Sequence, residues 1–347
     1  MKFFKVLQYC IIIAIVILAV SRLAPYIADF NKLIALKDHI NYWWIFAALF
    51  SQVFQYVGDG WFSQLLLKIA DIKVEFKDAI RIASMNVFAA HILPVGEAGG
   101  MAAAYHFYRK KGVSTEKFIF LTICWTSITH ILLVLLFIIP SYFLEETTPA
   151  LNTGIIFMGI LITALVFLIF YAISHHLISK LEKFLGKYKW AKPFFAFYHN
   201  RNIYIQRLKD HPVEIFFSII ASLIYYASNI ATLTFAFLAL GIFPSMTLII
   251  FAYAASLLFS KITLAPAGIG AAEASLILIF LGAHIDPPIA VGATLIYRFI
   301  SFWLPIPAGF LAFYSLKKES NGNIDFKALE NEMLSEEAPN SKHQPSK

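Results

Sequence analysis

The chain has 347 residues and a formal net charge of +7; 59% of its residues are hydrophobic and only 14% are charged. Soluble domains are about 45–50% apolar and about 25% charged, so this composition excludes a soluble globular protein and indicates a membrane protein. Two cysteines and a mean hydropathy of +0.71 also exclude a disulfide-stapled secreted domain and a disordered chain, and the positive charge predicts loop orientation in a membrane, not nucleic-acid binding.

Six apolar runs reach the length of about 20 residues that a helix needs to cross the hydrocarbon core. In chain order, the predicted spans are residues 7–24, 42–67, 118–140, 154–174, 213–240 and 288–316. Residues 1–20 also resemble a signal peptide, with Lys2 and Lys5 as its basic flank. The many spans that follow favour an uncleaved first helix.

Two further apolar stretches, residues 80–107 and 246–281, are each interrupted in the middle. The interruptions contain Pro94, Gly96, Pro266, Gly268 and Gly270. Each half is marginal or short for a span, and broken backbone at membrane depth is tolerated only where protein buries it or where it lines a wet cavity. The sequence therefore predicts two re-entrant helical hairpins, and a functional site is expected first at their tips.

Lysine and arginine gather in the connections on one side of the spans, and eight of them lie between residues 175 and 212. By the positive-inside rule, this bias predicts that both termini are cytoplasmic, in a multi-pass protein of the inner membrane. The two hairpins then enter from opposite faces. Residues 319–347 are polar and contain six acids, so they are predicted to form a disordered tail after a transmembrane domain of residues 1–318.

Residues 42–140 and 213–316 share one order of features, namely a span, a broken hairpin with a Pro-x-Gly and a glutamate, and a second span. Because the two units enter the membrane from opposite sides, they are predicted to form an inverted repeat. Inverted repeats with broken helices that meet near the midplane are typical of alternating-access transporters. The alternative interpretation is a pair of unrelated kinks.

Four charged residues fall at the breaks or near the centre of a span: Glu97, Lys261, Glu273 and Arg298. Charges at such positions need a partner or a wet cavity. Arg298 suits either a phosphate group or an ion pair with Glu273 or Glu97, because its fork of donors matches both. The two glutamates either stabilise the N-termini of half-helices or form the acidic side of a binding cavity, and Lys261 is a second candidate for contact with phosphate.

Polar residues also recur at helical spacing inside predicted spans. The stripes in residues 42–67 and 213–240 are formed by Gln52, Gln55, Asp59, Ser63, Ser218, Ser222, Tyr225, Asn229 and Thr232. They predict a shared wet interior, with Asp59 and Asn229 as further substrate contacts. The alternative is that these groups simply hydrogen-bond neighbouring helices.

No catalytic or cofactor motif accompanies these charges. Gly268, Gly270 and Glu273 begin like a dinucleotide fingerprint, but the third glycine and the surrounding strand and helix are missing. Walker loops, nucleophile elbows and clustered metal ligands are also absent from the sequence. We therefore expect neither an enzyme nor a cofactor or metal.

The hairpins carry a family resemblance. The matching residues are Asn86, Pro94, Gly96, Glu97, Arg109, Lys110, Lys111, Gly112, Pro266, Gly268, Gly270, Glu273, Arg298, Trp303 and Pro305. Together they resemble the lysylphosphatidylglycerol synthase transmembrane-region family, a flippase-like domain, over about residues 5–317. The resemblance implies re-entrant helices from opposite faces and movement of phospholipids or polyisoprenoid carriers between leaflets. In synthase members of the family, a soluble aminoacyl-transferase domain would follow. Residues 319–347 are too few for that domain, so the resemblance does not imply synthase activity.

Together, the residues and the resemblance predict an all-α polytopic helical bundle that moves a phospholipid or a polyisoprenoid-type amphiphile between leaflets. A membrane lipid is the expected substrate, and the sequence is compatible with a homo-oligomer or a separate soluble transferase partner. The alternatives are a cation- or proton-coupled carrier of a small solute, and the membrane partner of a lipid-headgroup transferase or glycosyl transferase.

Overall fold

The computed structural model describes residues 40–92, 97–144, 182–188, 191–262, 268 and 270–319, and the regular structure of these residues is entirely helical. The helices are α3 (Tyr42–Ile69), α4 (Phe76–Ile92), α5 (Glu97–Lys110), α6 (Thr115–Phe143), α9 (Lys192–His199), α10 (Arg201–Asp210), α11 (Pro212–Ala239), α12 (Met246–Ile262), α13 (Ala271–Gly282), α14 (Pro287–Arg298), the π-helical turn η4 (Phe299–Trp303) and α15 (Pro305–Glu319). The all-α prediction is confirmed for this part of the chain. The predicted spans at 7–24 and 154–174 lie outside the described residues.

Three helical segments are long and apolar enough to cross a membrane: Thr115–Phe143, Pro212–Ala239 and Pro287–Glu319. The last is α14, η4 and α15 in continuous succession, and it ends one residue into the predicted tail. They support an integral membrane protein. Helix α3 corresponds to the predicted span at 42–67 and is 28 residues long. It is not among the three apolar segments. It contains the predicted polar stripe with Gln52, Gln55 and Asp59.

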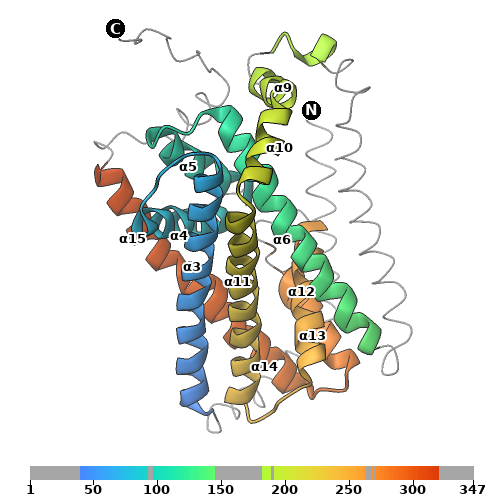
Figure 1. The fold of residues 1–347 in the computed structure, drawn as a ribbon. Helices are drawn as coiled ribbons and strands as arrows, with labels where there is room; N and C mark the ends of the chain where they lie inside the picture. The colour runs from blue at the N-terminus through green and yellow to red at the C-terminus, as the bar shows by residue number, and fades with distance from the viewer. Residues whose placement is uncertain are drawn as a thin grey trace, which may run out of the picture.

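Helices α3 and α11 form an antiparallel pair through the bundle (Figure 1). At one end, the backbone N–H of Asn41 donates to the carbonyl oxygen of Ala239 at 2.9 Å, and at the other Lys68 pairs with Glu214 at 2.9 Å. Between these ends, a Cβ atom at Gly58 would lie only 3.0 Å from the carbonyl oxygen of Ala221. The two backbones therefore approach through small residues, as is common where helices meet in membranes.

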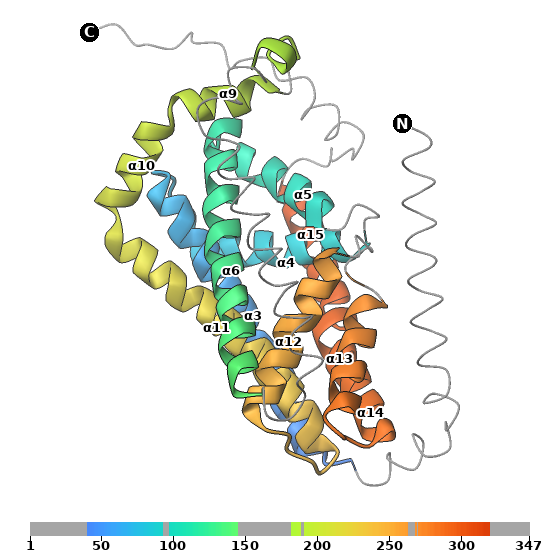
Figure 2. The same cartoon turned by 90° about the vertical axis from the view of Figure 1, so that its right-hand side faces the viewer.

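The remaining helices are divided between the two ends of this pair. Figures 1 and 2 show α4 and α5 in the half of the bundle nearer α9, and α12 and α13 in the half nearer α14. Within each half, the two helices pack against each other. Helix α4 also packs on α3, whereas α12 packs on α6 and α11.

Helix α15 covers α4 at close range. A Cβ atom at Gly309 would lie 2.5 Å from the Cβ atom of Phe88 and 2.6 Å from the carbonyl oxygen of Ser84. The ring of Phe88 also contacts Phe310 and Phe313, with centroids 5.8 and 6.1 Å apart. This contact fixes α4 against the long C-terminal helix.

Because α4 has no room for a methyl group at this point, Gly309→Ala should lower the free energy of unfolding by about 1–3 kcal/mol through overpacking. Thermal unfolding in detergent measures the change. The matched control is Gly112→Asn, because Gly112 has a φ of +88° with nothing within 4 Å of its Cβ position, and asparagine tolerates that conformation. Equal melting temperatures for both variants would contradict the close approach of α15 and α4.

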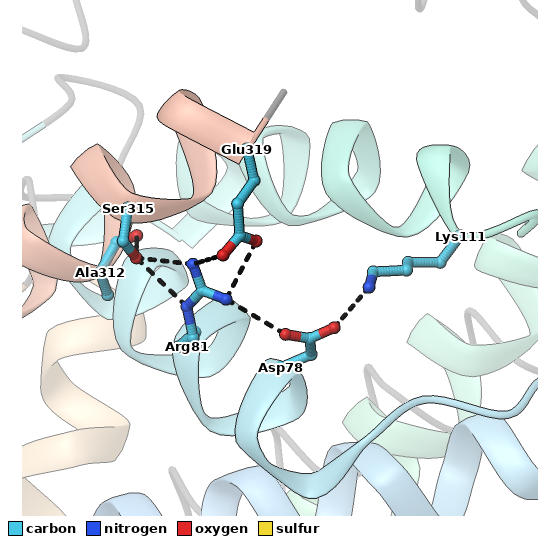
Figure 3. Close-up of polar contacts among 6 residues, drawn as sticks. All are labelled: Asp78, Arg81, Lys111, Ala312, Ser315 and Glu319. Carbon is cyan, nitrogen blue, oxygen red and sulfur yellow. Dashed lines mark hydrogen bonds and ion pairs between the residues drawn. The ribbon is translucent and has the colours of Figure 1, made fainter. Parts of the chain in front are cut away.

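Near the α9 end, a cluster of charges ties α4, α5 and α15 together (Figure 3). Arg81 donates to both carboxylate oxygens of Glu319, at 2.8 and 3.0 Å, and to Ser315 Oγ at 2.9 Å. It also pairs with Asp78 at 3.2 Å, and Lys111 bonds the second oxygen of Asp78. We call these five residues the Arg81 clasp.

Within the Arg81 clasp, the hydrogen bond from Lys111 holds the pKa of Asp78 below its ordinary value. A carboxylate with a lowered pKa in the folded state stabilises the fold at neutral pH. The contribution of Asp78 is therefore complete above its ordinary pKa and is lost only as the pH falls through the lowered value.

We expect Arg81→Gln to lower the free energy of unfolding by about 1.5 kcal/mol, because the side chain is mostly buried and loses bonds to two carboxylates. Glu319→Gln should have a smaller effect, because its side chain is 62% exposed. Melting temperatures at pH 7 compare the two. A larger loss from Glu319→Gln would show that Arg81 is not the centre of the clasp.

Candidate functional site

An ion pair joins the two helix breaks. Glu97 is the first residue of α5, and Lys261 lies in the last turn of α12, 164 residues later. The Nζ atom of Lys261 lies 2.9 Å from one carboxylate oxygen of Glu97 and 3.2 Å from the other. The flanks of the two breaks therefore meet, whereas residues 93–96 and 263–267 at the breaks themselves lie outside the described residues.

This pair lies in open surroundings. The side chain of Glu97 is 66% exposed and that of Lys261 is 30% exposed. Ion pairs that are exposed to water contribute only about 0–1 kcal/mol, much less than enclosed pairs.

The second pair, between Glu273 and Arg298, is more enclosed. The Nε atom of Arg298 donates to one oxygen of Glu273 at 2.6 Å, and their side chains are 12% and 22% exposed respectively. The other oxygen of Glu273 accepts a hydrogen bond from the backbone N–H of Gly270 at 2.7 Å, which caps the start of α13. Both oxygens of Glu273 are thus hydrogen-bonded, and Arg298 is bound to a side chain in the first turn of α13.

The guanidinium group of Arg298 lies over the ring of Phe302, 4.5 Å from its centroid. The same ring stacks on His91 at the end of α4, with centroids 4.2 Å apart. Phe302 belongs to the π-helical turn η4, and such turns are frequent at functional sites. Within the described residues, the Nη2 atom of Arg298 is buried without a hydrogen-bond partner, so its donors are available to an oxygen of a ligand.

Three tyrosines lie on α11 and α14: Tyr225, Tyr226 and Tyr297. Tyr226 and Tyr297 are buried, and Tyr225 is half-buried. The ring of Tyr226 contacts Tyr225, at 5.3 Å between centroids, and its hydroxyl group donates to the carbonyl oxygen of Thr129 on α6. Tyr297 directly precedes Arg298 in the chain.

The structure places the predicted site residues in two groups. Glu97, Lys261, Glu273 and Arg298 form the two ion pairs, which we call the paired-charge site. Asp59 lies elsewhere, in the contact between α3 and α11.

The break residues are described only in part. Gly268 and Gly270 have φ angles of +68° and +85°, and a Cβ atom at Gly268 would lie 2.4 Å from the Oγ atom of Ser260. Only glycine fits such a conformation and approach without strain. Pro94, Gly96 and Pro266 lie outside the described residues.

Part of the predicted polar stripe is hydrogen-bonded to other groups of the protein. Gln52 and Ser51 hydrogen-bond Thr232 across the α3–α11 contact, at 2.7 and 2.6 Å. Asn229 donates to the carbonyl oxygen of Tyr225 within its own helix. For these residues, the structure supports the alternative interpretation, in which polar side chains bond helices.

Sequence reasoning did not include Phe302 or Tyr297 in the site. Phe302 follows Arg298 by four residues, and this spacing alone would place it on the same face of a helix. Tyr297 directly precedes Arg298 in α14, but a tyrosine in a predicted span gives no signal of a site by itself.

Comparison with known proteins identifies the family of the chain. The family described as the lysylphosphatidylglycerol synthase TM region matches residues 9–309. The chain belongs to this family. It is 24% identical to a UPF0104 membrane protein of Methanocaldococcus jannaschii over 91% of this chain and 97% of the relative. It is 25% identical to a UPF0104 membrane protein of Pyrococcus horikoshii over 70% and 78% of the two chains.

Arg298→Lys should lower the free energy of unfolding by about 1–2 kcal/mol, because lysine has neither the Nε donor nor the planar group that lies on Phe302. The reciprocal change Lys261→Arg is the control and should have almost no effect, since its pair with Glu97 is exposed. Thermal unfolding in detergent checks both. An equal loss of unfolding free energy in both variants would mean that the two ion pairs contribute equally to stability, and would contradict this expectation.

Proposed function

We propose that this protein moves a phospholipid or polyisoprenoid-type amphiphile between membrane leaflets, with the headgroup bound at the paired-charge site. The observation that carries the proposal is the ion pair of Glu97 and Lys261, which joins the flanks of two helix breaks from separate halves of the bundle. The family supports a lipid substrate, because its name refers to lysylphosphatidylglycerol, which is an aminoacylated phospholipid.

In this proposal, α4 with α5 and α12 with α13 are re-entrant hairpins of an inverted repeat. The four helices have 17, 14, 17 and 12 residues, or about 18–26 Å at 1.5 Å per residue, and a hydrocarbon core is about 30 Å thick. The paired-charge site would then lie at membrane depth, where charges face a water-filled cavity. The lysine and arginine bias of the loops supports cytoplasmic termini, with the α9 end on the cytoplasmic side.

The two pairs have different tasks. Lys261 can leave the exposed Glu97 for a phosphate oxygen, and Glu97 can then accept a cationic group such as a headgroup amine. Arg298 stays on Glu273 and offers its Nη2 donors to the same phosphate. When the Glu97–Lys261 pair opens, a ligand that carries both charges can pair its phosphate with Lys261 and its cationic group with Glu97. Neither residue is then left as an unpaired charge.

We expect Glu97→Gln to insert and fold normally but to lose most lipid movement in proteoliposomes, because the amide keeps the shape of the side chain and removes its charge. Glu273→Gln should also lose transport, with some loss of stability from the weaker helix cap. A fluorescent phospholipid that is reduced only in the outer leaflet reports the movement.

The control for this assay is Glu214→Gln, which removes a carboxylate that pairs with Lys68 at the end of α3, away from the paired-charge site. It should retain transport. Normal rates in both Glu97→Gln and Glu273→Gln would remove the acids from the mechanism, and absence of lipid movement in the unmodified protein would remove the proposed function itself.

A further inference from the structure

Helices α3 and α11, which pack against each other, carry a set of buried polar groups. We call it the polar seam; it consists of Gln52, Gln55, Asp59, Ser218, Ser222 and Thr232. All six residues are at most 9% exposed. Within the described residues, Gln52 Oε1, Gln55 Oε1, Ser218 Oγ and Ser222 Oγ are buried without a hydrogen-bond partner.

Such a concentration of unsatisfied groups is unusual, because buried polar atoms in proteins are nearly always hydrogen-bonded. Ordered water is the usual partner where protein groups do not supply one, and it needs several polar neighbours. Gln52, Gln55 and Asp59 follow one another at spacings of three and four residues, which places them on one face of α3. The polar seam thus has the composition of a hydrated path inside the helix pair.

Asp59 is the acid within this path. It is 9% exposed, and among the described residues no lysine, arginine or histidine pairs with it. The side chain of Trp125 on α6 hydrogen-bonds its carboxylate. The titratable groups around it are Tyr56 on its own helix, Tyr108 on α5 and Tyr225 on α11.

Asp59 therefore differs in kind from the two acids of the paired-charge site. Glu97 and Glu273 each face a cation, so adding a proton to either would leave Lys261 or Arg298 unpaired. Asp59 has no such partner, and an isolated carboxylate in apolar surroundings is far more costly than a neutral carboxylic acid. Asp59 can gain or lose a proton without abandoning a cation.

We propose that Asp59 is the proton-binding residue of this protein, and that the polar seam carries protons between it and the aqueous phase. A proton from water forms an O–H bond with the carboxylate, and the same bond breaks when the acid releases the proton to the other side. This inference rests on the proposed function in one respect, because the proton would be coupled to lipid movement.

Infrared difference spectroscopy on the purified protein tests proton binding without any transport assay. When the pH is lowered from neutral to mildly acidic values, we expect a band from the C=O stretch of a protonated carboxylic acid to appear in the difference spectrum, and Asp59→Asn should remove it. Glu97→Gln and Glu273→Gln are the matched controls and should retain the band. Absence of the band in the unmodified protein, or its persistence in Asp59→Asn, would overturn the proposal.

Coupling is tested in proteoliposomes with different pH inside and outside. One proton per lipid allows up to about tenfold accumulation for each pH unit, since both correspond to about 1.4 kcal/mol. The unmodified protein should show this dependence, and Asp59→Asn should move lipid at a rate independent of the gradient. A gradient response that survives Asp59→Asn would overturn the coupling.

Two results separate this inference from the proposed function. If no lipid moves in any variant, the proposed function fails, whereas the infrared band still decides whether Asp59 binds a proton. If Asp59→Asn does not fold, Asp59→Glu replaces it, because the longer acid keeps a protonated band but should shift its frequency. An unshifted band in Asp59→Glu would assign the proton to another residue and overturn the proposal.

Discussion

The contact between α3 and α11 is the interaction on which the positions of the other helices depend. Helix α4, which packs against α5, contacts α3. Helix α12, which packs against α13, contacts α11, and so does α14. Because Gly58 brings the two backbones together, this contact tolerates little change in side-chain volume. A polar row inside such a tight contact is costly unless its groups are hydrated or bonded, so its presence points to a use beyond packing.

Charge pairing is the second constraint on the interior. Each acid at a helix break has a basic partner from another element: Glu97 has Lys261, and Glu273 has Arg298. The Glu97–Lys261 pair is the more exposed one, whereas the enclosed pair also forms the cap of α13 and stacks against an aromatic ring. The two pairs therefore differ in burial and in the number of further contacts that hold them.

Much of the fold follows from local sequence patterns. The long apolar runs predicted α3, α6 and α11 to within three residues of each end, because few other arrangements hide so many consecutive apolar side chains. Proline and glycine located the two breaks for a similar reason, since both residues interrupt helical backbone. The charged site residues were found because charge in an apolar run is rare.

The pairing of those charges could not be predicted in the same way. Both Glu97 and Glu273 were open as partners of Arg298, and the choice depends on how distant helices pack. The π-helical turn at Phe299–Trp303 inserts an extra residue into a helix, and no pattern in the sequence marks it. It contains Phe302, and the stack of this ring on His91 depends on how α4 packs against the turn, so it could not be predicted from the sequence.

The continuous helix from Pro287 to Glu319 has a mechanical consequence. Arg298 contacts Glu273 near its middle, and Glu319 enters the Arg81 clasp at its end, about 32 Å away at 1.5 Å per residue. The helix thus has one polar contact near its middle and another at its end. A rotation about the helix axis that broke one of these contacts would strain the other, unless the wider π-helical turn between them took up the rotation.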